Sequence, residues 1–229
     1  MAESVVGDRA AIRHEIRLSG SGGQGIILAA TLLADAAVAS GREVIGTQSY
    51  GPAARGGASK AEVIIADDEI DFPEVTAPAI TVCLSQEAFD AYAPLTVPGG
   101  LVVYDERLVS AQPPVSAQPL ATAQPPITAQ PLEGLRLVGL PFTHLAETEL
   151  GKAIAANIVM LGALQQLTGV VRADALHDAV RRRLPAKIVE LNIRALKLGH
   201  DCAAEAERSA AAPRHRRAAA GGMGASGPA

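Results

Sequence analysis

The chain has 229 residues, of which 48% are hydrophobic and 3% aromatic, and its formal net charge at pH 7 is −4. This length suits one domain of ordinary size, and the slight negative charge gives no indication of nucleic-acid binding. No uninterrupted apolar run is long enough to cross a membrane, and residues 1–8 lack the basic start and apolar body of a signal peptide. We therefore expect a cytoplasmic protein that binds neither nucleic acid nor a membrane.

A glycine-rich loop follows the first predicted strand. Residues 15–25 read E-I-R-L-S-G-S-G-G-Q-G, and three of the glycines match the pattern G-x-G-x-x-G. A helix is predicted directly after the loop, so several backbone N–H groups and the positive end of the helix dipole should point at one place. We predict a Rossmann-like first βα unit whose loop suits a phosphate or carboxylate. The candidate binding residues in this loop are Gly20, Ser21, Gly22, Gly23, Gln24 and Gly25.

The next segment argues against an ordinary dinucleotide site. The predicted helix over residues 26–40 ends at Gly41, and the second predicted strand covers about residues 43–46. Units that bind NAD or FAD carry an acidic residue at the end of this strand, where it holds the ribose hydroxyls. Here the strand continues as G-T-Q-S, without Asp or Glu. The sequence therefore disfavours NAD and FAD.

A second turn-rich motif holds an arginine between glycines. Residues 50–57 read Y-G-P-A-A-R-G-G, and proline and glycine at this density predict a loop. Arg55 would then be a fixed cation that faces whatever the first glycine loop faces. The candidate binding residues in this motif are Tyr50, Arg55, Gly56 and Gly57.

Strand and helix signals alternate along the middle of the chain. Ser85 should cap a helix over residues 86–92. Further strands are predicted over residues 59–66, 80–84, 101–104 and 136–140. This alternation predicts an α/β domain with three layers, α/β/α, around a mostly parallel sheet.

An internal repeat separates the last two predicted strands. The tripeptide Ala-Gln-Pro begins at residues 111, 117, 123 and 129, a period of six. Proline at this spacing excludes a helix and any interior strand. We predict an extended, polyproline-like surface loop over residues 110–133 and assign it no function.

The last part of the domain should be helical. Five apolar residues at helical spacing predict a helix over residues 152–167, namely Ile154, Ile158, Leu161, Leu164 and Leu167. Asn157 should hydrogen-bond a neighbouring loop from this helix. Two more helices are predicted over residues 172–183, which ends in three arginines, and 185–198, which should end at Gly199.

The predicted domain covers residues 12–200. Residues 201–229 contain almost no large apolar side chain, so we expect a disordered tail.

Catalytic and metal-binding groups are scarce. Five histidines are scattered without metal-ligand spacing, and His144 is expected in a loop. Cys83 should be buried and Cys202 should lie in the polar tail, and two cysteines cannot supply the four thiolates of an iron–sulfur cluster. We predict no catalytic residue, metal or cofactor held by this chain alone. The carboxylates near strand ends should cap turns, namely Asp67, Asp68 and Asp105.

The two motifs, in this order, resemble the gamma subunit of 2-oxoacid:ferredoxin oxidoreductases, which include the pyruvate, ketoisovalerate and 2-oxoglutarate enzymes. The similarity rests on G-S-G-G-Q-G, on T-Q-S-Y-G-P-x-x-R-G-G, and on A-N-I-V-M-L-G-A-L at residues 156–164. It covers about residues 12–200, apart from the repeat. One departure is Ala53-Ala54, where the family usually carries an acidic residue, so no role is assigned to a carboxylate there.

The resemblance implies a subunit of an enzyme that oxidatively decarboxylates a 2-oxoacid on thiamine diphosphate and transfers the acyl group to coenzyme A. Electrons leave such enzymes through iron–sulfur clusters to ferredoxin. The thiamine site and the clusters belong mainly to alpha, beta and ferredoxin-like delta subunits, while the gamma subunit can help to enclose coenzyme A. The isolated chain is therefore expected to be inactive.

The form of the second motif, Y-G-P-x-x-R-G-G, resembles the 2-oxoglutarate branch of the family and favours 2-oxoglutarate as the substrate. Two alternatives stay open: a stand-alone nucleotide-binding oxidoreductase, and a purely structural assembly subunit whose glycine loops press against partner chains.

Overall fold

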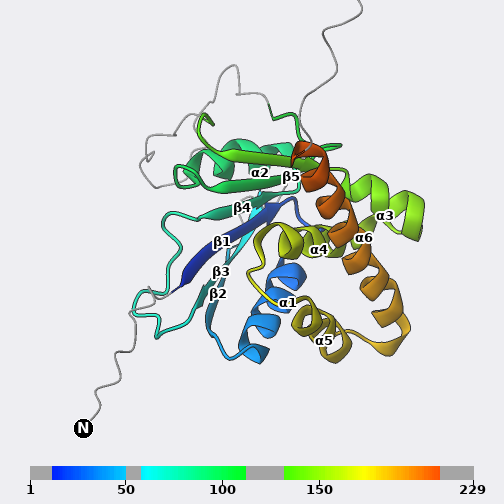
Figure 1. The fold of residues 1–229 in the computed structure, drawn as a ribbon, viewed down its shortest axis with the longest axis horizontal. Coiled ribbons are helices and arrows are strands. Elements are labelled where there is room, and N and C mark those ends of the chain that lie inside the picture. Colours follow the sequence, from blue (N-terminus) through cyan, green and yellow to red (C-terminus); the bar gives the residue numbers. More distant parts are fainter. Residues whose placement is uncertain (1–11, 50–57, 112–131, 212–229) are drawn as a thin grey trace, which may run out of the picture.

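Six strands form one sheet in the computed structural model, which describes residues 12–49, 58–111 and 132–211 (Figure 1). The strand order is β2-β3-β1-β4-β5-β6. β3 is antiparallel to β1 and β2, whereas β1, β4, β5 and β6 pair in parallel. The predicted α/β class with a mostly parallel sheet is confirmed. The strands are β1 (Arg13–Gly20), β2 (Glu43–Ser49), β3 (Ser59–Ala66), β4 (Ile80–Cys83), β5 (Leu101–Asp105) and β6 (Arg136–Leu140).

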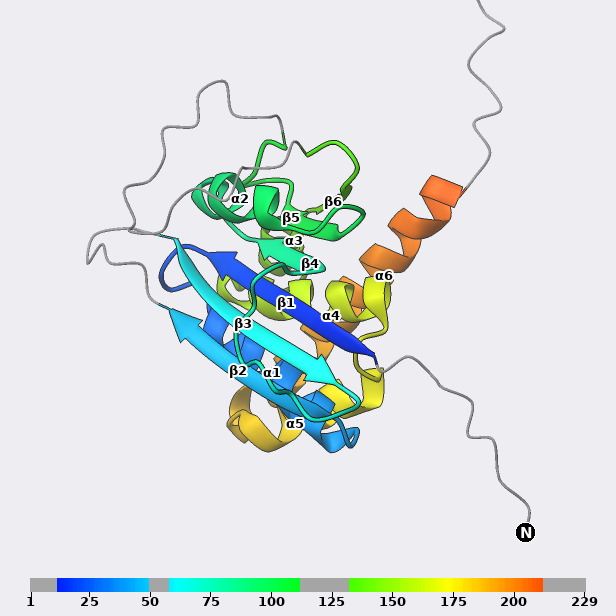
Figure 2. The ribbon, with the colours of Figure 1, turned by 90° about the vertical axis from the view of Figure 1, so that its left-hand side faces the viewer.

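Helices cover both faces of this sheet. One face carries α1, α3, α4, α5 and α6, and the opposite face carries α2 over β4 and β5 (Figure 2). This arrangement is the predicted three-layer architecture. The helices are α1 (Ile26–Ala39), α2 (Gln86–Tyr92), α3 (Phe142–Leu150), α4 (Ala156–Thr168), α5 (Ala173–Arg183) and α6 (Ala186–Ala211), with short 3₁₀ turns η1 (Ala93–Leu95) and η2 (Ala153–Ala155).

The larger hydrophobic core lies between the sheet and the layer of five helices. Ile16 and Leu18 of β1 point into this core, and because side chains alternate along a strand, Arg17 between them points to the opposite face. A smaller core lies under α2, where Phe89 meets Val102 and Tyr104. The Phe89 and Tyr104 rings pack edge to face with their centroids 5.5 Å apart.

Two glycines let α4 and α6 pack backbone against backbone. A Cβ atom on Gly162 would overlap the Leu196 carbonyl oxygen, and one on Gly199 would overlap the Val159 carbonyl oxygen. The prediction that Gly199 ends the last helix is therefore wrong: the glycine serves close packing, and α6 continues to Ala211.

The ordered part of the chain extends beyond residue 200, where the disordered tail was predicted to begin. Residues 201–211 are helical, and Cys202 and Ala203 pack against the larger core. Residues 212–229 lie outside the described residues, so their predicted disorder stays a prediction.

The helical part begins earlier than the apolar spacing predicted. His144 lies in α3 and not in a loop. The first turn of α3 is capped from a distant strand, because the Asp105 carboxylate accepts from the backbone N–H of Thr143 at 2.8 Å and from its hydroxyl at 2.6 Å. Ile154, expected in the apolar stripe of the next helix, is 71% exposed in η2.

The Ala-Gln-Pro repeat lies mostly outside the described residues, which exclude 112–131. Its ends, Ala111 and Leu132, both pack against the core under α2. The polyproline-like conformation of the repeat stays a prediction. Within the described ranges, none of the helices combines the length and the apolar character that a membrane span needs.

Candidate functional site

The two sequence motifs begin at one edge of the sheet. β1 ends at Gly20, β2 ends at Ser49, and β3 starts at Ser59, directly opposite Gly20. The Ser59 hydroxyl donates to the Gly20 carbonyl at 3.1 Å. Ser49 pairs with Lys60, which in turn pairs with the residue before Gly20. We call Gly20, Ser49 and Ser59 the motif edge, because the glycine loop and both ends of segment 50–57 meet there.

Gln24 braces the glycine loop from inside. Its side-chain oxygen accepts from the Ser21 backbone N–H at 2.7 Å, and its side-chain nitrogen donates to the Leu84 carbonyl at 2.8 Å. A Cβ atom on Gly20 would overlap the Gln24 side chain. The structure therefore gives Gln24 an internal contact, and the Ser21 N–H is already paired.

Other parts of the same loop are open. Gly22 and Gly23 are exposed, and a Cβ atom on either would meet nothing within 4 Å. The helix α1 that follows has no capping side chain and no acidic residue in its first turn. The first N–H groups of a helix lack partners inside the helix, so this end of α1 can accept an anion.

The loop is anchored on its other side by α4. The Asn157 side-chain nitrogen donates to the Gly25 carbonyl at 3.0 Å, and Asn157 is 4% exposed. The predicted role of Asn157, a helix-borne amide that bonds a neighbouring loop, is confirmed. Gly25 has a φ of 71°, and a Cβ atom there would overlap the Asn157 amide.

The second motif lies outside the described residues, which resume at Ala58. The predicted contributions of Tyr50, Arg55, Gly56 and Gly57 therefore stay predictions. The described strands β2 and β3 nevertheless bring both ends of this segment to the motif edge, next to the glycine loop.

A buried charged cluster lies below the motif edge on the sheet face opposite the larger core. The Glu62 carboxylate accepts from Arg17 at 2.7 Å and from Lys60 at 3.1 Å. The motifs in the sequence did not predict this cluster. Arg17 within an apolar strand, and Lys60 and Glu62 two residues apart on one strand face, are the signals that could have revealed it.

Within the described ranges, no three His, Cys, Asp or Glu side chains are grouped in a way that could hold a metal ion. Cys83 is fully buried, and burial raises the pKa of its thiol to about 12. A thiol of this kind is inert as a nucleophile at neutral pH. Asp105 caps a turn as predicted, since it accepts from the Arg107 N–H at 3.0 Å.

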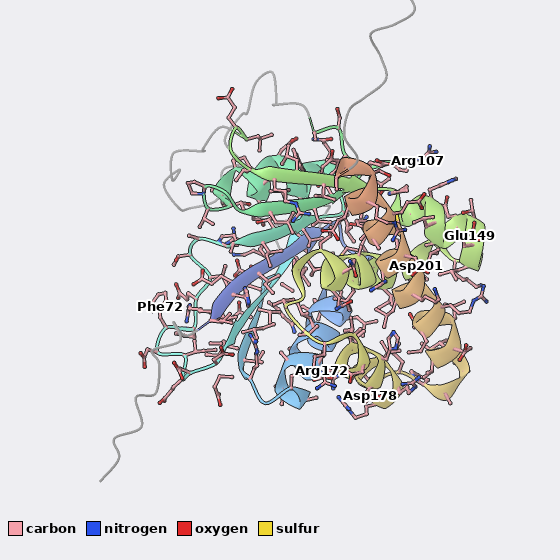
Figure 3. All side chains as sticks on the ribbon, viewed as in Figure 1. Phe72, Arg107, Glu149, Arg172, Asp178 and Asp201 are labelled. Atoms are coloured by element: carbon pink, nitrogen blue, oxygen red, sulfur yellow. The ribbon has the colours of Figure 1, made fainter. Side chains whose placement is uncertain are left out.

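The arginines at the end of α5 belong to a solvated surface. Arg181 pairs with Asp178 at 3.2 Å and Arg183 pairs with Asp35 of α1 at 3.3 Å, all with exposed side chains. Figure 3 shows Asp178 beside α5, at the lower margin of the molecule in that view. Exposed pairs of this kind contribute little to stability.

Comparisons with known proteins place these features in a family. Residues 15–202 match the family described as pyruvate ferredoxin/flavodoxin oxidoreductase. The 2-oxoglutarate synthase subunit KorC of Methanocaldococcus jannaschii is 44% identical over 198 residues, which are 86% of this chain and 97% of that relative.

Solved structures agree with this assignment. The gamma subunit of a keto/oxoacid ferredoxin oxidoreductase from Geobacter sulfurreducens is 39% identical with a TM-score of 0.70, over 85% of this chain and 98% of that chain. A 2-oxoglutarate:ferredoxin oxidoreductase from Magnetococcus marinus, with 2-oxoglutarate, coenzyme A and succinyl-CoA bound, has a TM-score of 0.67 at 21% identity, over 84% of this chain and 31% of that chain. At that identity the second likeness concerns the fold alone. The chain belongs to the pyruvate ferredoxin/flavodoxin oxidoreductase family, as its two motifs indicated.

Proposed function

We propose that this chain is the gamma subunit of a cytoplasmic, multi-subunit 2-oxoacid:ferredoxin oxidoreductase that acts on 2-oxoglutarate. The observation that carries the proposal is the 44% identity to a 2-oxoglutarate synthase subunit over nearly the whole of that relative. The partners are alpha and beta subunits, together with a ferredoxin-like delta subunit where the enzyme has one.

The positions of the two cysteine thiols support the assignment of the iron–sulfur clusters to those partners. Thiamine diphosphate and iron–sulfur clusters supply decarboxylation and electron transfer, and clusters need several converging thiolates. Cys83 lies under α2 and Cys202 lies on α6, against a different core, so their thiols do not converge. We therefore assign the clusters to the partner subunits, and we assign the thiamine site there because the resemblance to gamma subunits implies it.

The motif edge suits an anionic ligand instead. The open glycines Gly22 and Gly23 and the uncapped end of α1 offer backbone N–H groups without a competing carboxylate. Coenzyme A carries phosphates that such groups bind well. In this proposal Arg55 adds a guanidinium to the same anion, and the chain's part in the reaction is to hold and orient coenzyme A.

An assembly role for the same edge is the second candidate. Ile154 is 71% exposed only three residues before Asn157, which contacts the glycine loop. A single exposed apolar side chain is common on protein surfaces, so this second candidate rests on the open glycines of the loop. In this version Gly22 and Gly23 allow close approach of a partner backbone.

The test of the proposed function is reconstitution with the subunits encoded beside this chain. We expect the complex to reduce ferredoxin in a reaction that needs both 2-oxoglutarate and coenzyme A. Pyruvate, branched-chain 2-oxoacids and arylpyruvates should show lower kcat/KM values. A higher kcat/KM for one of these, or activity without coenzyme A, would contradict the proposal.

Arg55→Ala separates the two versions of the site. Removing a charged hydrogen-bond donor should weaken coenzyme A binding by about 1.5–3 kcal/mol, which would raise the apparent KM for coenzyme A. Arg55→Lys is the matched control, because lysine keeps the charge but not the bidentate geometry. Under the assembly version Arg55→Ala weakens subunit association and leaves the kinetics of the intact complex unchanged. Wild-type assembly with wild-type kinetics would exclude both versions for Arg55.

A further inference from the structure

Glu62 connects the three strands that carry the two motifs. Its side chain comes from β3 and is directly opposite Arg17 of β1 and Thr47 of β2 in the strand register. The carboxylate accepts from Arg17 Nε at 2.7 Å and from Lys60 Nζ at 3.1 Å, and the Thr47 hydroxyl lies 3.5 Å from its second oxygen. Glu62 is only 8% exposed and Arg17 only 4%, so the contact between them is shielded from water, whereas Lys60 and Thr47 are partly exposed.

Arg17 is the main partner of the Glu62 carboxylate and is itself held by few other contacts. Arg17 is 4% exposed, its Nη2 donates to the Val75 carbonyl at 3.3 Å, and its Nη1 has no hydrogen-bond partner among the described residues. The guanidinium also lies 5.5 Å from the centre of the Tyr92 ring. A buried guanidinium with so few acceptors needs its carboxylate, and losing one partner of such a pair leaves a charge uncompensated.

This cluster lies just below the motif edge. Arg17 precedes Gly20 by three residues, Thr47 precedes Ser49 by two, and Glu62 follows Ser59 by three. At about 3.3 Å per residue, the position of Glu62 along the sheet is about 10 Å from Gly20 and Ser59 and about 7 Å from Ser49. Because the strands are regular over this distance, a shift of one strand against another at Glu62 should displace the strand ends at the motif edge by a similar amount.

We propose that Glu62 is a positioning residue for the motif edge. It fixes the offset between the glycine loop and the two strand ends that flank segment 50–57. The functional consequence, alignment of that edge with coenzyme A, rests on the proposed function. The alignment of the three strand ends is a property of the chain itself.

The opposite end of the same strand offers a matched control. Arg13 and Glu15 form a 3.0 Å ion pair on the same face of β1, but at the end far from the motif edge and with greater exposure than the Arg17–Glu62 pair. Glu15→Gln removes a carboxylate from the same sheet face without touching the cluster. Any effect that Glu62→Gln shares with Glu15→Gln is therefore a general effect of charge removal.

Two measurements test the proposal. Hydrogen exchange on the full chain should show faster exchange of the amides in residues 20–28 in Glu62→Gln than in Glu15→Gln, with exchange in α4 unchanged. In the reconstituted complex Glu62→Gln should raise the apparent KM for coenzyme A about tenfold with kcat little changed, because small displacements of binding groups have effects of at least this size. Thr47→Val, which leaves the buried Arg17–Glu62 pair intact, should produce the same changes at smaller amplitude.

The proposal is overturned if either readout of Glu62→Gln equals that of Glu15→Gln. If Glu62→Gln does not fold, Thr47→Val is compared with Glu15→Gln by the same criterion. A wild-type complex without coenzyme A-dependent activity would refute the proposed function, whereas the exchange measurement would still decide whether Glu62 positions the edge.

Discussion

Replacing Gly25 by alanine should destabilise the fold through two separable effects. The φ of Gly25 is 71°, and a left-handed backbone costs an alanine about 1–2 kcal/mol. The new Cβ atom would also overlap the Asn157 amide, which donates to the Gly25 carbonyl at 3.0 Å. Leaving that buried amide unpaired costs about 1–3 kcal/mol. We expect the free energy of unfolding to fall by about 2–5 kcal/mol in total.

Two neighbouring glycines provide the controls for urea denaturation followed by circular dichroism. Gly23 has a φ of 87°, but a methyl group added there would have no neighbour within 4 Å, so Gly23→Ala should show the backbone cost alone, about 1–2 kcal/mol. Gly22 has neither a positive φ nor a neighbour, so Gly22→Ala should leave the free energy of unfolding nearly unchanged.

Equal losses for Gly25→Ala and Gly23→Ala would refute the reasoning, because the Asn157 contact would then contribute nothing measurable. Gly22→Ala adds a functional readout. Since its methyl group has free space in the isolated chain, a loss of activity or assembly at unchanged stability would locate a ligand or partner at Gly22.

Three further predictions concern the rest of the chain. Gly199→Ala should lower the free energy of unfolding by about 3 kcal/mol or more, since its methyl group would overlap the Val159 carbonyl, and a loss below about 1 kcal/mol would contradict the close packing of α4 and α6. Replacing residues 112–131 by a short Gly-Ser linker should change stability by less than about 1.5 kcal/mol in thermal unfolding, because loop length contributes weakly; a fall of many degrees in Tm would show that the repeat is packed. Burial raises the pKa of Cys83 from 9.0 to about 12. The thiol therefore ionises at a lower pH in the unfolded chain than in the folded one. Between pH 9 and 12 the free energy of unfolding of the wild type, relative to that of Cys83→Ala, should fall by about 1.4 kcal/mol per pH unit. A difference between the two proteins that does not change with pH would refute this.

Local sequence signals were sufficient for most of the sheet and for the helices whose caps are local. Ser85 caps α2 as predicted, because its hydroxyl accepts from the Ala88 N–H at 3.3 Å, three residues away. The start of α3 was missed because its cap, Asp105, comes from another strand. The true end of α6 was missed because Gly199 was interpreted from the helix alone, whereas its role depends on the facing helix α4.

The glycine loop shows the same limit within the candidate site. Its position between a strand and a helix could be predicted from the spacing of the glycines. The different surroundings of the glycines could not be predicted. Gly20 is crowded by Gln24 and Gly25 by Asn157, whereas Gly22 and Gly23 have open space around them. Asn157 is far from Gly25 in the sequence, and only the packing of α4 against the loop brings them together.

The strand order explains why the glycine pattern does not make a dinucleotide site here. In a dinucleotide-binding unit the acidic residue that holds the ribose lies at the end of the strand next to β1. In this sheet β3 occupies that place, so β2 is two strand spacings, or about 10 Å, from β1. The position beside Gly20 is filled by Ser59, which follows the segment that contains Arg55 by two residues. The missing carboxylate and the inserted antiparallel strand thus have one consequence: the strand end beside Gly20 offers the Ser59 hydroxyl in place of the carboxylate that a ribose needs.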